Sequence, residues 1–136
     1  MSARILLAYS DTGGGHRSAA RAIADAIAAQ RAGAIVQGVD VLAEYAPWPF
    51  HRMPAWYPRA IDCAAPLWGA GFALTDTPRR AALLQRLAWP VVRAGFARLA
   101  QERRPDVVVS THPLLASPLR RALPDVPIVT VVTDLV

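Results

Sequence analysis

Four short apolar runs divide this chain, and apolar residues recur at helical spacing in the segments between them. The runs cover residues 4–10, 35–41, 106–110 and 128–133. Apolar runs of this length are typical of strands that are buried on both faces of a parallel sheet. We therefore predict four strands at these positions.

The segment between the first two runs shows the signals of a helix. Residues 16–31 carry apolar side chains three and four positions apart, and Gly33 follows them as a helix stop. A second, shorter helix is predicted over residues 114–123. Strands that alternate with helices indicate an α/β fold, with a Rossmann-like parallel sheet, right-handed crossovers and flanking helices.

The longest predicted helix covers residues 78–103. Thr77 is a good N-cap, and Pro78 occupies the first helical position, where proline is well tolerated. Pro90 lies inside the helix and removes one backbone hydrogen bond, so we expect a kink there.

The composition is that of a folded domain. The 136 residues suit one domain, and 54% hydrophobic against 18% charged residues exclude intrinsic disorder. All 15 basic residues are Arg, and the net charge is +5. This charge suits either a solvated surface or attraction to anionic partners. We expect no nucleic acid among these partners. The single Cys63 excludes an internal disulfide, and no apolar run is long enough to span a bilayer.

The chain ends at Val136, directly after an apolar segment and without a polar tail. A domain seldom ends inside its core sheet. We therefore expect residues 1–136 to be one truncated domain of a longer protein.

Polar residues gather at the carboxyl ends of the predicted strands, whereas the strand interiors are apolar. In an open parallel sheet, ligands bind at this edge, near the point where the strand order reverses. One interpretation is that these residues make only turns and helix caps, and the other is that they form a binding site. The residues are Ser10, Asp11, Asp40, Ser110, Thr111, His112, Thr133 and Asp134.

Three successive glycines, Gly13, Gly14 and Gly15, connect the first strand to the first helix. Glycines adopt backbone angles denied to other residues and let another group approach the main chain closely. The helix that follows directs N–H groups and a partial positive charge at the same space, which suits a phosphate or a developing negative charge. The plainer alternative is a tight strand-to-helix turn.

Two histidines stand beside this loop or beside another strand end. His16 lies in the first helical turn, where the partial positive charge disfavours the imidazolium, and a neutral imidazole can accept a proton as a general base. The alternative is a histidine that caps the loop. His112, directly before Pro113, either orients a substrate or closes a turn.

Several other site classes lack their residues. A Walker loop needs a Lys, and the sequence has none; it also has no G-x-S-x-G elbow. No second acidic cluster supports a metal site, so we expect neither metal nor cofactor. A dinucleotide site remains an alternative, because Asp40 ends the second strand where a ribose-binding acid belongs, although Ser18 replaces the third glycine.

The stretch YSDTGGGHRSA at residues 9–19 closely resembles the amino-terminal motif of monogalactosyldiacylglycerol synthases and bacterial processive diacylglycerol glucosyltransferases. Residues 111–113 (THP) and 132–134 (VTD) are similar to two further markers in the same order. These enzymes are inverting, two-domain glycosyltransferases of the GT-B type. The resemblance implies that the chain is the amino-terminal, acceptor-side domain, that the donor-binding carboxyl-terminal domain is absent, and that this chain alone is inactive.

The resemblance also implies a reaction and a set of roles. A hydroxyl of diacylglycerol or a similar lipid attacks the anomeric carbon of a UDP-sugar with inversion, in glycolipid synthesis. His16 takes the hydroxyl proton, Asp134 assists it, and the backbone of Gly13, Gly14 and Gly15 holds the donor phosphates. The residues that bind or orient the acceptor are Ser10, Asp11, Thr111 and His112.

Residues 45–72 are rich in proline and aromatic residues with interspersed Arg, which suits a membrane interface. The alternative is a loop that packs its aromatic residues on the core. The residues that we expect at the interface are Trp48, Phe50, Trp56, Tyr57 and Trp68. Together with the resemblance, they predict a bacterial, cytoplasmic enzyme bound peripherally to anionic lipid at the inner face of the cell membrane. A dinucleotide-binding module and a non-catalytic, membrane-associated remnant remain as alternatives.

Overall fold

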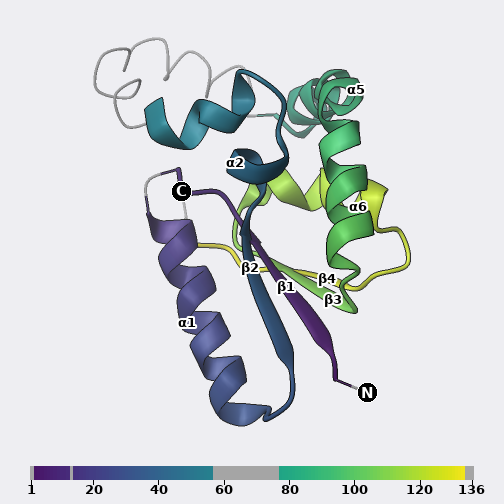
Figure 1. Ribbon diagram of the computed structural model, residues 1–136. Coiled ribbons are helices and arrows are strands. Elements are labelled where there is room, and N and C mark those ends of the chain that lie inside the picture. Colours follow the sequence, from purple (N-terminus) through teal and green to yellow (C-terminus); the bar gives the residue numbers. More distant parts are fainter. Residues whose placement is uncertain (1, 13, 57–76, 134–136) are drawn as a thin grey trace.

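The computed structural model describes residues 2–12, 14–56 and 77–133. Within them the chain has the α/β fold that the apolar pattern predicts (Figure 1). Gly13, Tyr57, Trp68 and Asp134, to which the sequence assigns roles, lie outside the described residues.

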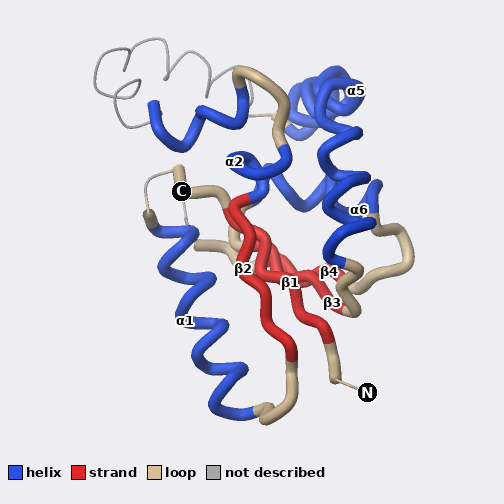
Figure 2. Tube along the Cα trace, viewed as in Figure 1, coloured by secondary structure: helices blue, strands red, loops and turns tan. Residues whose placement is uncertain are grey.

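A parallel sheet of four strands, in the order β2-β1-β3-β4, forms the centre of the fold. The strands are β1 (Arg4–Tyr9), β2 (Ile35–Asp40), β3 (Val107–Ser110) and β4 (Ile128–Thr130), so all four predicted strands are confirmed. Because the strands are parallel, their carboxyl ends meet at one edge of the sheet. Helix α1 (Gly15–Gln30) covers one face, and α5 (Pro78–Arg103) and α6 (Ala116–Ala122) cover the other (Figure 1, Figure 2).

Some predicted ends differ from the observed ones, and hydrogen bonds explain why. β4 ends at Thr130 rather than at Thr133, because the chain leaves the sheet once the N–H of Val131 has bonded to the carbonyl of Ser110 at 2.8 Å. β2 ends at Asp40, whose carboxylate accepts the N–H of Ala43 at 3.0 Å and so caps α2 (Val41–Tyr45). The helix predicted over 114–123 divides into a 3-10 turn, η2 (Pro113–Leu115), and α6.

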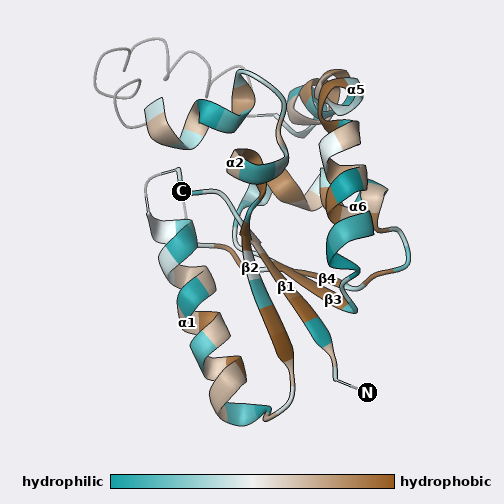
Figure 3. Ribbon diagram, in the orientation of Figure 1, coloured by the Kyte–Doolittle hydropathy of each residue, from teal (hydrophilic) through white to brown (hydrophobic). Residues whose placement is uncertain are grey.

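The core lies on both faces of the central strand β1. Leu6 and Leu7 are each only 1% exposed, and successive residues of a strand point to opposite faces, so both faces of the sheet are covered. Leu6 belongs to a core cluster with Leu99 of α5 and Leu119 of α6, whereas Leu7 faces α1. In Figure 3 the strands are coloured largely as hydrophobic.

Helix α5 begins as the sequence predicts. Thr77 caps it by accepting the N–H of Arg80 on its hydroxyl at 3.4 Å, and Pro78 stands in the first turn. The helix continues through Pro90, but its two halves run in different directions (Figure 1), which matches the predicted kink. Only the second half contributes buried residues, Phe96 and Leu99.

Tyr45, the first residue of the predicted 45–72 interface segment, belongs to the core rather than to a membrane interface. The prediction is wrong at this residue. Its hydroxyl donates to Glu102 at 2.8 Å and accepts from Nε of Arg103 at 2.9 Å, and its ring is 5% exposed. Burial raises the pKa of the Tyr45 phenol above its usual value. Gly95 permits this contact, because a Cβ there would collide with the carbonyl of Tyr45.

Candidate functional site

The carboxyl ends of β1 and β3 meet the amino-terminal end of α1 at one edge of the sheet (Figure 1). Three segments that are far apart in the sequence supply polar side chains there. They are the glycine loop after β1, the Thr111-His112 pair after β3, and Thr133 beyond β4. The structure therefore brings together most of the strand-end residues that the sequence singles out.

The glycine loop delivers the chain into α1 in a conformation that only glycine adopts readily. Gly14 is the N-cap residue, with φ +83° and ψ −26°, and its carbonyl accepts the N–H of Ser18 at 3.0 Å. The helix start has no side-chain cap and no acidic residue in its first turn. A Cβ added at Gly14 or Gly15 would meet no atom of the described residues within 4 Å, so the loop borders open space. Backbone N–H groups at such a helix start are suited to bind an anion.

His16 is held firmly from one side of its ring. It is 7% exposed, and its Nδ1 lies 2.7 Å from the carbonyl oxygen of Thr111 and 2.8 Å from the hydroxyl of Thr133. A carbonyl oxygen can only accept, so Nδ1 carries the proton and the neutral ring has its lone pair on Nε2. The hydroxyl of Thr111 also donates to the carbonyl of His16 at 2.9 Å, which fixes the helix start against β3. This geometry suits a base that accepts a proton at Nε2.

His112 packs against His16, with ring centroids 4.4 Å apart and the rings tilted by 49°. Its Nδ1 accepts the N–H of Leu114 at 3.3 Å, so the neutral ring carries its proton on Nε2, which lies 3.2 Å from the hydroxyl of Thr12. The turn-closing role of His112 is therefore confirmed, and its role in orienting a substrate stays a prediction. It closes the turn into η2, and it presents its ring beside the candidate base.

Two predicted acceptor-binding residues do not reach the surface. Ser10 and Thr111 are both 0% exposed, because they directly follow β1 and β3, the two central strands of the sheet. Thr111 positions His16 instead of an acceptor. The hydroxyl of Ser10 is buried, with no hydrogen-bond partner among the described atoms.

Asp11 remains partly exposed and forms an ion pair with Arg17, whose Nη1 donates to it at 2.8 Å. This hydrogen bond, together with the charge of Asp11, raises the pKa of the Arg17 guanidinium. The N–H of Asp11 donates to Asp40 at 3.0 Å. Asp40 thus accepts the N–H of Asp11 with one carboxylate oxygen and caps α2 with the other. The dinucleotide alternative, which depends on Asp40, stays a prediction.

Sequence reasoning left two contributors without a role. The sequence marks Thr133 only as a strand-end residue and Thr12 only as part of the YSDTGGGHRSA stretch. In the structure Thr133 contacts His16, and Thr12 contacts His112. The VTD string includes Thr133, but Thr133 and His16 are 117 residues apart in the sequence, and no local pattern indicates their contact. The part of the chain that the structure describes holds no group of three or more His, Cys, Asp or Glu residues that suits a metal ion.

Apart from Tyr45, the described aromatic residues of the predicted interface segment lie at the surface. Trp48 is 75% exposed, and Phe50 and Trp56 are each 43% exposed. Phe50 begins the 3-10 turn η1 (Phe50–Arg52). Over the described residues, no helix is both long and apolar enough to cross a membrane.

Comparison with known proteins gives a consistent result. The family model "Monogalactosyldiacylglycerol (MGDG) synthase" matches residues 16–136. The chain is 35% identical over 140 residues to "Monogalactosyldiacylglycerol synthase, chloroplastic" of Spinacia oleracea, covering 97% of this chain and 26% of the relative. It is 38% identical over 144 residues to "Probable monogalactosyldiacylglycerol synthase 2, chloroplastic" of Oryza sativa subsp. indica, covering 96% of this chain and 29% of the relative. No solved structure matches the chain.

The chain spans only 26% to 29% of the length of these relatives. Both are plant chloroplast proteins, so the expected bacterial source stays a prediction.

Proposed function

The chain belongs to the MGDG synthase family, and on that premise we propose that it is the amino-terminal, acceptor-side part of an inverting GT-B glycosyltransferase. The proposed reaction moves a hexose from a UDP-sugar to diacylglycerol or a similar lipid. The names of the relatives specify a monogalactosyl product, which supports galactose as the hexose. The single observation in the structure that carries the proposal is the orientation of His16.

His16 acts as the general base in this proposal. Its Nε2 takes the proton of the acceptor hydroxyl while that oxygen forms a bond to the anomeric carbon. The bond between the anomeric carbon and the UDP oxygen breaks on the opposite side, and UDP leaves with the electron pair. The Thr111 carbonyl, 2.7 Å from Nδ1, stabilises the imidazolium that results.

The donor diphosphate is proposed to lie against the glycine loop. Gly14 and Gly15 border open space at a helix start without a side-chain cap, and backbone N–H groups there neutralise negative charge as the diphosphate leaves. The proposed transfer therefore uses no metal and no cofactor. Roles for Gly13 and for Asp134 as an aid to the base remain predictions.

Asp11 and His112 are the candidates for orienting the acceptor. Asp11 is partly exposed beside Arg17, and His112 lies against the ring of His16. The acceptor is a membrane lipid, and the exposed Trp48, Phe50 and Trp56 support peripheral attachment of the enzyme to the inner face of a cell membrane.

The proposal is tested with the full-length polypeptide that contains these residues. Labelled UDP-galactose and UDP-glucose are supplied with a short-chain diacylglycerol dispersed in detergent, and the lipid product is separated and counted. We expect transfer of a single hexose with inverted anomeric configuration. Hydrolysis of the UDP-sugar without a glycolipid product, or retention of configuration, would refute the proposal.

A further inference from the structure

The first half of α5 exposes a continuous set of large apolar side chains. Leu83, Leu84, Leu87 and Val91 are between 47% and 65% exposed, and we call them the leucine stripe. They recur at spacings of three and four residues, so they share one face of the helix. The opposite face of α5 around Pro90, represented by Trp89 and Val92, packs against the core.

Arginines flank the leucine stripe without acidic residues to neutralise them. Residues 77–97 contain four arginines and no Asp or Glu, and the next arginine, Arg98, pairs with Glu102. Arg79, Arg86 and Arg93 are all exposed and lie seven residues apart, which places them along one side of the stripe. An apolar face bordered by arginines is typical of a helix that lies in the interface of an anionic membrane.

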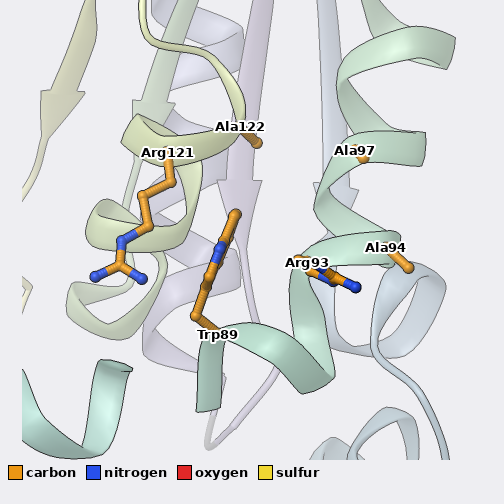
Figure 4. A pocket seen from close by; sticks show the side chains of 6 residues that line it. All are labelled: Trp89, Arg93, Ala94, Ala97, Arg121 and Ala122. Carbon is orange, nitrogen blue, oxygen red and sulfur yellow. The ribbon is translucent and has the colours of Figure 1, made fainter. Parts of the chain in front are cut away.

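A groove between α5 and α6 continues the basic side of this helix. Figure 4 shows the arginines Arg93 and Arg121 on either side of the Trp89 ring, and the Arg121 guanidinium lies 5.3 Å from the ring centroid. The groove holds about 410 Å³ and is lined by Trp89, Arg93, Ala94, Ala97, Arg121 and Ala122. Two guanidinium groups beside an aromatic ring suit the phosphate of a lipid headgroup.

The first half of α5 lies at the same end of the molecule as the carboxyl ends of the strands. In Figure 1 the first half of α5 and the segment with Phe50 both lie at the end toward which the strands direct their carboxyl ends. Trp48, Phe50 and Trp56 are the exposed aromatic residues of that segment. A bilayer against this end would lie near the glycine loop and His16.

We propose that the first half of α5 docks the protein on an anionic bilayer, with the leucine stripe entering the interface and Arg79, Arg86, Arg93 and Arg121 binding lipid phosphate. The proposal rests on the proposed function, since a lipid acceptor must be reached in its bilayer. It goes beyond the aromatic segment, because it assigns the docking to a helix outside residues 45–72.

The test measures binding of the full-length polypeptide to vesicles of phosphatidylcholine with and without phosphatidylglycerol. The leucines contribute by burying apolar surface, and the arginines contribute by attraction to anionic lipid. Substitutions at the two sets therefore weaken different parts of the interaction. The double variant Leu83→Gln/Leu87→Gln should lose about tenfold or more in binding to anionic vesicles. The variant Arg79→Gln/Arg86→Gln should lose about 20-fold on anionic vesicles and almost nothing on neutral ones.

Matched controls come from the opposite end and face of the domain. Ile35→Gln removes an exposed apolar side chain at the start of β2, 46% exposed against 57% for Leu83 and 65% for Leu87. Arg21→Gln/Arg31→Gln removes two exposed charges from α1 and its end. Both controls should bind vesicles as the wild type does. Binding that falls equally in the control and stripe variants would overturn the proposal.

A labelling experiment identifies what covers the leucine stripe. Leu87→Cys, in a Cys63→Ser background, should react with a water-soluble maleimide and become protected when anionic vesicles are added. Protection without vesicles would mean that another part of the polypeptide or a protein partner covers the stripe, and would overturn the proposal. Hexose transfer to the detergent-dispersed acceptor is measured separately, so failure of docking and failure of the proposed function remain distinguishable.

Discussion

Replacement of His16 by Ala tests the central step of the proposed reaction. The side chain is held by the Thr111 carbonyl and the Thr133 hydroxyl, both at Nδ1, which directs the lone pair of the neutral ring to Nε2. Loss of a general base costs about 10² to 10⁴ in rate. At about 1.36 kcal/mol for each factor of ten, this is a barrier increase of about 2.7 to 5.5 kcal/mol.

The structure sets a smaller expected effect for Thr133→Val. The substitution removes one of the two oxygens at Nδ1 and leaves the 2.7 Å contact with Thr111 in place. A neutral hydrogen bond contributes about 0.5 to 1.5 kcal/mol net, so kcat should fall about twofold to tenfold. The predicted order of kcat is therefore wild type, then Thr133→Val, then His16→Ala.

The assay is steady-state hexose transfer by the full-length polypeptide to a detergent-dispersed acceptor. His51→Ala is the matched control, since it removes a histidine to which no role is assigned. Thermal unfolding by circular dichroism separates catalytic loss from unfolding, and added imidazole should partly restore the His16→Ala variant. A kcat for His16→Ala within about threefold of wild type would remove His16 from the role of base, because a general base contributes at least about 10².

Three further predictions concern the loop and the α2–α5 contact. Gly14→Ala should destabilise the fold by about 1 to 2 kcal/mol in urea unfolding, because φ is +83° there. Gly15→Ala should leave stability unchanged or raise it, but it should raise KM for the UDP-sugar. Gly95→Ala should destabilise by about 3 kcal/mol or more, because its Cβ would collide with the Tyr45 carbonyl and the two helices would have to separate. The pKa of the Tyr45 phenol is higher in the folded state than in the unfolded chain, so the unfolded chain loses this proton first as the pH rises. The free energy of unfolding should therefore fall as the pH rises past 10.0. Tyr45→Phe should be about 1 kcal/mol less stable and should show a smaller fall with pH.

Much of the fold could be predicted from local pattern. The four apolar runs located every strand, and the Thr77-Pro78 pair located the start of α5. Strand ends were less accurate, because they depend on which partner a backbone group finds. Val131 bonds to Ser110 of a neighbouring strand, and no pattern within residues 128–133 shows this.

The candidate site was predictable as a set of residues but not as a set of roles. The strand-end rule gathered the residues that the structure brings together, since parallel strands place their carboxyl ends at one edge. It could not separate exposed from buried members, which depends on the position of each strand in the sheet. Ser10 and Thr111 directly follow the two central strands, and both are buried.

The contacts at His16 imply that the base is assembled only when three segments of the chain come together. Thr111 and Thr133 lie 95 and 117 residues away in sequence, and each meets the same Nδ1. If Thr133 acts only by orienting His16, then removing it from a protein that already lacks the imidazole should change nothing further. The double variant His16→Ala/Thr133→Val should therefore have the kcat of His16→Ala alone, a non-additivity that double-mutant cycles measure directly. Full additivity would instead place Thr133 in contact with the reacting groups and leave the orientation of His16 to the Thr111 carbonyl.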